Sequence, residues 1–140
     1  MAKFTKILVP LDGSSNSMRG LDRAIEIAKD SSAEITGFYV FHLPIAAGIK
    51  YTAKMKEDAQ KKAVKAIGPA MNKAQKAGAV FKYKTGGGNT GAEIVKFAKN
   101  GKFDMIVIGA RGVGGAKEAF LGSTSNYVMH KTKVPVLVVK

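Results

Sequence analysis

Glycine and hydroxyl residues in the last third of the chain have the spacing of an anion-binding loop. Residues 105–108 form a continuous apolar run of strand length, and Gly109 ends it. Arg111 and Gly112 lie in the loop that follows, and Gly122 to Thr124 open a helical segment whose first N–H groups have no acceptor within the helix. Such a helix start attracts phosphate, and hydroxyls and an arginine add donors. The pattern predicts a phosphate-binding loop; the alternative is a solvated loop in which glycine serves only for turning.

A second candidate group follows the first apolar run of the chain, residues 6–11. Asp12 stands there before a glycine and two serines that favour a turn and a helix start. If the strands before these two groups are neighbours, Pro10, Leu11 and Asp12 face the pocket of the glycine loop. A carboxylate repels phosphate, so Asp12 is expected to accept hydrogen bonds from a ribose or to hold a divalent cation that bridges to phosphate. The alternative is a cap of the following helix.

The elements that must position these groups alternate along the chain. Strand patterns occupy residues 6–11, 34–42, 79–85, 105–108 and 134–139, and helical patterns fill the intervals, the longest at 52–77. This alternation predicts a mostly parallel sheet with helices on both faces, in which ligands bind beyond the carboxyl ends of the strands where the strand order reverses.

Three short segments carry local signals for how their elements bend, connect and begin. Gly68-Pro69 is expected to kink or split the long helix, because proline removes an N–H group and clashes with the preceding turn. The triplet Gly86 to Gly88 is interpreted as a flexible connector after an exposed or edge strand. Thr90 and Glu93 have the spacing of a capping box at the start of the next helix.

Composition narrows the classes of function. The chain has 140 residues, 46% of them hydrophobic, which suits one domain with one well-buried core. It has no cysteine and two histidines, so a metal site built on those residues is not expected. No apolar segment is long enough for a signal peptide or a membrane span, so a cytoplasmic location without membrane association is expected.

The formal net charge of +13 permits attraction to polyanions. However, the lysines are spread, and their densest region, residues 50–76, is interpreted as the solvent side of a helix with few aromatic residues beside it. Specific binding of nucleic acid is therefore not the leading hypothesis.

The glycine loop also carries a family signature. Gly109-Ala110-Arg111-Gly112 is followed by nine residues and then by Gly122-Ser123, a GxxG, nine residues, G(S/T) pattern. With the opening KILVPLDGS and the closing VPVLVVK, the chain resembles the nucleotide-binding branch of the universal stress protein family over essentially residues 1–140. The resemblance implies a single flavodoxin-like (Rossmann-like) α/β domain, with helices on both faces of a five-stranded parallel sheet in the order 3-2-1-4-5.

The resemblance also implies a ligand and its contacts. The ligand is ATP, accompanied by Mg²⁺ or Mn²⁺, and the protein is a homodimer through its last strand. Carried over by position, the resemblance places the ribose at Gly109, the ribose and metal side at Pro10 and Asp12, and the adenine at the backbone of Val40. It places the phosphates at Gly112, Gly122, Ser123 and Thr124.

Three functions remain open at this point. The leading hypothesis is a nucleotide-dependent regulatory protein of the stress response, in which bound ATP biases the loops and the dimer toward a state that unidentified partners recognise. The second is a slow magnesium-dependent ATPase or phosphotransferase, although neither histidine lies in the motif and no general base is evident. The third is a charge-driven nucleic-acid-associated module.

Overall fold

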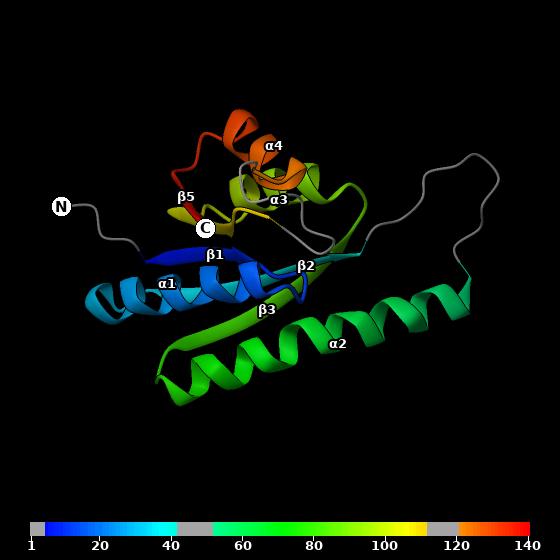
Figure 1. The fold of residues 1–140 in the computed structure, drawn as a ribbon, viewed down its shortest axis with the longest axis horizontal. Helices are drawn as coiled ribbons and strands as arrows, with labels where there is room; N and C mark the ends of the chain where they lie inside the picture. The colour runs from blue at the N-terminus through cyan, green and yellow to red at the C-terminus, as the bar shows by residue number, and fades with distance from the viewer. Residues whose placement is uncertain (1–4, 42–51, 112–120) are drawn as a thin grey trace.

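A computed structural model, which describes residues 5–41, 52–111 and 121–140, shows a five-stranded sheet between two layers of helices (Figure 1). All neighbouring strands are parallel, in the order β3-β2-β1-β4-β5. This confirms the predicted fold class and strand order. The elements are β1 (Lys6–Pro10), α1 (Ser15–Ser31), β2 (Glu34–Phe41), α2 (Ala53–Lys76), β3 (Val80–Gly87), α3 (Thr90–Asn100), β4 (Met105–Gly109), α4 (Ser123–Lys131) and β5 (Val136–Val139).

Each face of the sheet has its own hydrophobic core, because successive strand residues point to opposite faces. Ile7 and Val9 of β1 pack with α1 and α2 on one side, and Leu8 packs with α3 and α4 on the other. Figure 1 shows these helix layers on either side of the sheet. Strands buried on both faces explain the continuous apolar runs of the sequence.

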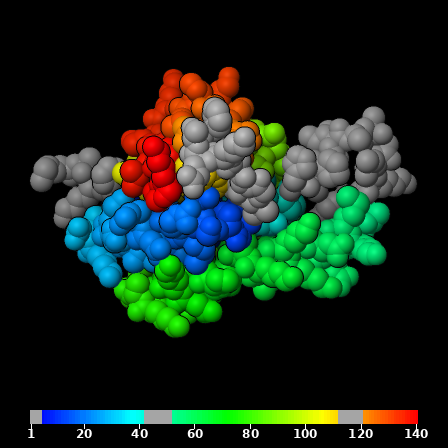
Figure 2. Space-filling view, in the orientation of Figure 1, coloured from blue at the N-terminus to red at the C-terminus, as the bar shows by residue number. Residues whose placement is uncertain are grey.

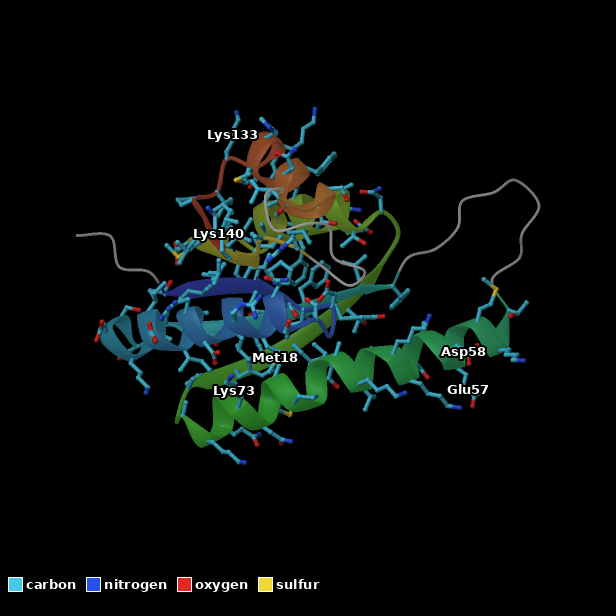
Figure 3. All side chains as sticks on the ribbon, in the orientation of Figure 1. Met18, Glu57, Asp58, Lys73, Lys133 and Lys140 are labelled. Atoms are coloured by element: carbon cyan, nitrogen blue, oxygen red, sulfur yellow. The ribbon has the colours of Figure 1, made fainter. Side chains whose placement is uncertain are left out.

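The first helix packs as its apolar spacing predicts. Leu21, Ile25 and Ala28 of α1 are buried in the core with α2, and Met18 packs against its edge (Figure 3). The helix begins after Ser14, whose hydroxyl accepts a hydrogen bond from the backbone N–H of Ser17. A stripe of apolar residues and a serine cap therefore fix this helix on the sheet.

The long helix α2 is not split at Gly68-Pro69, which lies inside a single element of 24 residues. Two physical reasons account for its continuity. Gly68 has no Cβ to crowd the ring of the proline that follows it. Pro69 and Lys65 are both exposed, so water can reach the Lys65 carbonyl that loses its helical donor.

The solvent side of α2 carries lysines, as expected from the density of charge at residues 50–76. Exposed lysines of this helix are Lys54, Lys56, Lys61, Lys62, Lys65, Lys73 and Lys76. Figure 2 shows α2 along the lower side of the molecule, and Figure 3 shows Glu57 and Asp58 near its start, on the part that extends away from the sheet.

No helix within the described ranges has the length and apolarity needed to cross a membrane.

The glycine triplet is not a connector as interpreted. Gly86 and Gly87 belong to β3, an edge strand as expected, and pair with Val40 and Phe41 of β2. Only Gly88 leaves the strand, with a φ of 134° that favours glycine. Strand pairing with β2 therefore extends the element beyond what local propensity predicts.

The expected capping box of α3 is also wrong by one residue. The N-cap is Asn89, whose side-chain oxygen accepts from the backbone N–H of Ala92 at 3.0 Å, and Thr90 is already inside the helix. Asparagine is as good an N-cap as threonine or better, so the two residues compete for the position and the backbone path out of β3 decides between them.

A carboxylate at the other end of the sheet ties β1 to β4. Asp104 accepts hydrogen bonds from the backbone N–H groups of Thr5 and Lys6, both at 2.9 Å, and from the Thr5 hydroxyl at 3.0 Å. The N–H groups of Thr5 and Lys6 hold the pKa of Asp104 below its ordinary value of 3.8. The contact aligns the starts of two neighbouring strands whose far ends border the candidate site.

Asp104→Asn is expected to lower the free energy of unfolding at pH 7 by about 1 kcal/mol, because an amide accepts these bonds without charge. Since folding lowers the pKa of Asp104, its contribution is complete above pH 3.8 and is lost as the pH falls through the lower value in the folded protein. Denaturant unfolding of both proteins between pH 7 and pH 2 checks this. The difference between them should shrink at the acid end; a difference independent of pH would contradict the assignment.

Candidate functional site

The candidate site lies where the strand order reverses, beyond the carboxyl ends of β1 and β4. β1 pairs with β2 on one side and with β4 on the other. From β1 the chain passes to α1, which packs on one face, and the chain after β4 reaches α4 on the opposite face. The two connections therefore diverge, and in sheets of this kind the divergence places the ligand crevice between them. This brings the Asp12 turn and the start of α4 to the same edge of the sheet, as predicted.

Asp12 forms a turn and does not cap α1. Its Oδ1 accepts a hydrogen bond from the backbone N–H of Ser14 at 2.9 Å, and Ser14 itself provides the helix cap. The carboxyl group is half-buried, and its negative charge acts on Tyr39 of β2. Burial, and after it the charge of Asp12, raises the pKa of the Tyr39 hydroxyl. The carboxylate is thus held at the end of β1 by the turn that follows it.

Pro10 and Leu11 are buried at the end of β1. The Leu11 side chain is 2% exposed and packs in the core, where its Cδ1 would lie 2.8 Å from a Cβ added at Gly37. Its N–H group donates to the Phe38 carbonyl at 2.9 Å. Leu11 can therefore contribute to the crevice only through its backbone.

The backbone of Val40 faces the crevice. The Phe38 carbonyl points toward β1 and accepts a hydrogen bond from the Leu11 N–H. The Phe41 carbonyl points toward β3 and accepts one from the Gly88 N–H at 3.1 Å. Because backbone groups alternate along a strand, the N–H and C=O of Val40 point to the β1 side. The paired register of β1 with β2 ends at Phe38, so these groups lie beyond the last β1 residue.

Gly109 has a packing role at the end of β4. A Cβ there would lie 2.6 Å from the Asn16 carbonyl oxygen and 3.0 Å from the Ser17 nitrogen, both in the first turn of α1. Glycine therefore allows the start of α1 to approach β4 closely. Arg111 follows two residues later and is half-buried. Gly112 lies outside the described residues, as does the rest of the loop to residue 120.

The start of α4 presents backbone N–H groups, as predicted from Gly122 to Thr124. Gly122 is the N-cap, with φ −68° and ψ 158°, and it provides no side-chain acceptor. The other three helices have capping side chains at Ser14, Thr52 and Asn89. The first N–H bonded within α4 is that of Asn126, which donates to the Gly122 carbonyl at 3.0 Å. Within the helix the N–H groups of Ser123 and Thr124 therefore have no acceptor, which is the arrangement that attracts an anion.

Sequence reasoning missed Ser125. Its side chain is 2% exposed, and its hydroxyl donates to the Ala110 carbonyl at 2.8 Å and to the Gly122 carbonyl at 3.0 Å. The Gly122 N–H donates to the same Ala110 oxygen at 2.6 Å. The only indication in the sequence is a third hydroxyl residue directly after Ser123 and Thr124, which a solvated helix start would also show.

The residues at the crevice fit a metal that arrives with a nucleotide better than a resident ion. Within the described ranges no three histidine, cysteine, aspartate or glutamate side chains are grouped to hold a metal. Asp12 supplies one carboxylate, and Mg²⁺ is commonly held by one or two carboxylates together with substrate phosphates. The donor set thus matches a bridging role for Asp12.

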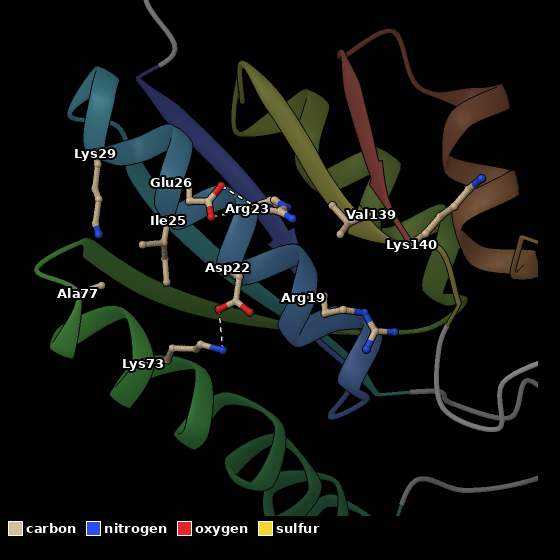
Figure 4. A pocket seen from close by; sticks show the side chains of 10 residues that line it. All are labelled: Arg19, Asp22, Arg23, Ile25, Glu26, Lys29, Lys73, Ala77, Val139 and Lys140. Atoms are coloured by element: carbon tan, nitrogen blue, oxygen red, sulfur yellow. Dashed lines mark hydrogen bonds and ion pairs between the residues drawn. The ribbon is translucent and has the colours of Figure 1, made fainter. Parts of the chain in front are cut away.

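A hollow of about 470 Å³ lies on the outer side of α1, between this helix, the end of α2 and the end of β5 (Figure 4). Lys73 of α2 pairs with Asp22 of α1 at 2.6 Å across it, and Arg23 pairs with Glu26 at 3.0 Å along α1. Its acidic and basic side chains alternate along α1, which is typical of a solvated helix face. It is lined by Arg19, Asp22, Arg23, Ile25, Glu26, Lys29, Lys73, Ala77, Val139 and Lys140.

Comparison with known proteins agrees with the signature and the fold. The model of the universal stress protein family matches residues 3–140. The chain is 32% identical to the universal stress protein YxiE of Bacillus subtilis, over 98% of this chain and 99% of that protein. It superposes with a TM-score of 0.87 on the universal stress protein UspA from Lactobacillus plantarum, which is 26% identical and covered in full.

A further solved structure is a universal stress protein in complex with cAMP, 26% identical, with a TM-score of 0.75 and coverage of 99% of this chain and 98% of that one. The match of the family model over nearly the whole sequence confirms the resemblance read from the glycine loop. The chain belongs to the universal stress protein family.

Proposed function

We propose that this protein binds an adenine nucleotide, ATP with Mg²⁺ or Mn²⁺, in the crevice between β1 and β4, and acts as a nucleotide-dependent regulatory protein of the stress response. The observation that carries the proposal is the start of α4, where the N-cap Gly122 offers no side chain and the N–H groups of Ser123 and Thr124 have no acceptor within the helix, an arrangement that suits phosphate. A universal stress protein of the same fold, 26% identical, was solved in complex with cAMP.

Each side of the crevice then has one task. The α4 start holds the phosphates, and the backbone of Val40 donates to and accepts from the adenine edge. Asp12 accepts from the ribose or holds the metal that bridges to phosphate. Bound Mg²⁺ would neutralise phosphate charge beside this carboxylate. Of the candidate general bases, His130 is exposed in the last turn of α4, at the opposite end from Gly122, which favours binding over fast hydrolysis.

ATP with Mg²⁺ is expected to raise the melting temperature, because a ligand that binds only the folded state stabilises it by mass action. At 100 times the Kd the stabilisation is about 2.7 kcal/mol, which corresponds to a shift of several degrees. Thermal melts with ATP, AMP, cAMP and GTP, each with and without Mg²⁺, test the nucleotide and the metal together. No shift with any of them at millimolar concentration would rule the proposal out.

A homodimer through β5 forms the second part of the proposal. β5 is an edge strand of sequence VLVV, and its Leu137 is 37% exposed. An apolar edge with unpaired backbone groups favours pairing with a second copy of the same strand. Light scattering at micromolar concentration is expected to give the mass of a dimer, and Leu137→Lys to give a monomer. A wild-type monomer at tens of micromolar would contradict the proposal.

A further inference from the structure

The carbonyl of Ala110, just beyond β4, anchors the start of α4. It accepts the Gly122 N–H at 2.6 Å and the Ser125 hydroxyl at 2.8 Å. The N–H of the same residue donates to the Val139 carbonyl at 2.8 Å, so the sheet fixes the orientation of this peptide. Ala110 and Ser125 are both buried, at 3% and 2% exposure. The start of α4 is therefore tied to the sheet through one buried residue and not through the surface.

The Ser125 hydroxyl faces two acceptors at once. Its single proton lies between the Ala110 oxygen at 2.8 Å and the Gly122 oxygen at 3.0 Å. Ser125 thus joins the end of β4 to the N-cap residue of α4. The buried Ala110 carbonyl and the half-buried Gly122 carbonyl share this donor, so its removal leaves each with one partner fewer.

This contact sets the direction of the N–H groups that would bind phosphate. Ser123 and Thr124 stand between Gly122 and Ser125, the two residues that are bonded to Ala110. Rotation or translation of the first turn of α4 would move both N–H groups together. Hydrogen-bond donors that are held in place before binding contribute most to anion affinity, and displacement by a fraction of an ångström weakens them.

We infer that Ser125 is a positioning residue for phosphate: its buried hydroxyl fixes the start of α4 on Ala110 so that the N–H groups of Ser123 and Thr124 converge on the phosphates of the nucleotide. The inference rests on the proposed nucleotide binding. Ser125 acts without touching the ligand, since its own hydroxyl is committed to Ala110 and Gly122.

The test compares ATP, which has phosphates, with adenosine, which has none. Ser125→Ala is expected to weaken ATP binding about 10-fold or more and to leave adenosine binding within about twofold, measured by calorimetric titration with Mg²⁺. Ser125→Cys keeps the shape of the side chain but has a weaker hydrogen-bond donor, so its ATP affinity should lie between those of the wild type and Ser125→Ala. A role in stability alone would change both ligands equally, so the ratio of the two affinities is the decisive quantity.

Ser31→Ala is the matched control, because the Ser31 hydroxyl also donates to a backbone carbonyl, that of Ile27 at 3.0 Å, but in the last turn of α1. This variant should leave the affinities for both ligands unchanged. If Ser125→Ala and Ser125→Cys bind ATP as the wild type does, the positioning role is wrong while nucleotide binding stands. If the wild type binds neither ATP nor adenosine, both the inference and the proposed function are wrong.

Discussion

Gly122→Val is expected to weaken ATP binding by about 100-fold or more while the protein remains folded. A valine side chain at the N-cap would occupy the approach of phosphate to the N–H groups of Ser123 and Thr124. Hydrogen bonds to a charged group contribute roughly 1.5–3 kcal/mol each, and each 1.4 kcal/mol is tenfold in affinity, so loss of two gives a change of this size. Calorimetric titration with ATP and Mg²⁺ measures it.

The backbone of Gly122 explains why stability should be spared. Its φ of −68° and ψ of 158° lie in the extended region that valine prefers, so the substitution adds no backbone strain. Gly20→Ala serves as control, since a Cβ at Gly20 makes only an ordinary contact, 3.4 Å from the Gly109 nitrogen, and the site is inside α1. Normal ATP affinity in the valine variant would mean that phosphate binds elsewhere in the chain.

Gly109→Ala is expected to differ from Gly122→Val, because its main effect should be a lower free energy of unfolding. The added Cβ would lie 2.6 Å from the Asn16 carbonyl oxygen and 2.7 Å from its carbon, and a backbone cannot move aside as a flexible side chain can. Overpacking of this kind costs roughly 1–3 kcal/mol, which lowers the melting temperature by several degrees. Chemical denaturation followed by circular dichroism gives the free energy of unfolding.

Gly20→Ala is the matched control at the same contact between α1 and β4. Gly20 lies on α1, and a Cβ there would be 3.4 Å from the Gly109 nitrogen, an ordinary contact. Alanine is also the better helix former by about 0.8–1.0 kcal/mol, so this variant should be as stable as the wild type or more so. Equal losses in both variants would indicate that the tight contact is not specific to Gly109.

The parts of the fold that were predictable are those that hydrophobic periodicity determines. Five apolar runs separated by helical segments predict the layers, and the family resemblance implies the strand order in which β1 and β4 are neighbours. The glycine triplet was misread because pairing of Gly86 and Gly87 with Val40 and Phe41 overrides local propensity. The continuity of α2 through Pro69 depends on the solvent exposure of Pro69 and Lys65, and hydrophobic periodicity predicts the exposure of single residues only approximately.

The candidate site was predictable for the residues that a motif names, and less so for those that act through packing. The ribose contact expected for Gly109 stays a prediction, whereas its close packing against Asn16 was not expected. Leu11 was expected to line the pocket, but its side chain is in the core. In the sequence, Ser125 cannot be told from a serine at a solvated helix start. Only the fold shows that the Ala110 carbonyl lies within reach of its hydroxyl.

The missing side-chain cap of α4 has a consequence for how the protein opens locally. A helix of nine residues is too short to be stable alone, and this one has no capping side chain at its first turn. Its amides should therefore exchange with solvent hydrogen sooner than those of α1, which has 17 residues and a serine cap. A bound anion at Gly122 would act as the cap, so ligand binding would slow exchange in α4 more than in the other helices. The nucleotide would then complete the last helix of the fold as well as occupy its crevice.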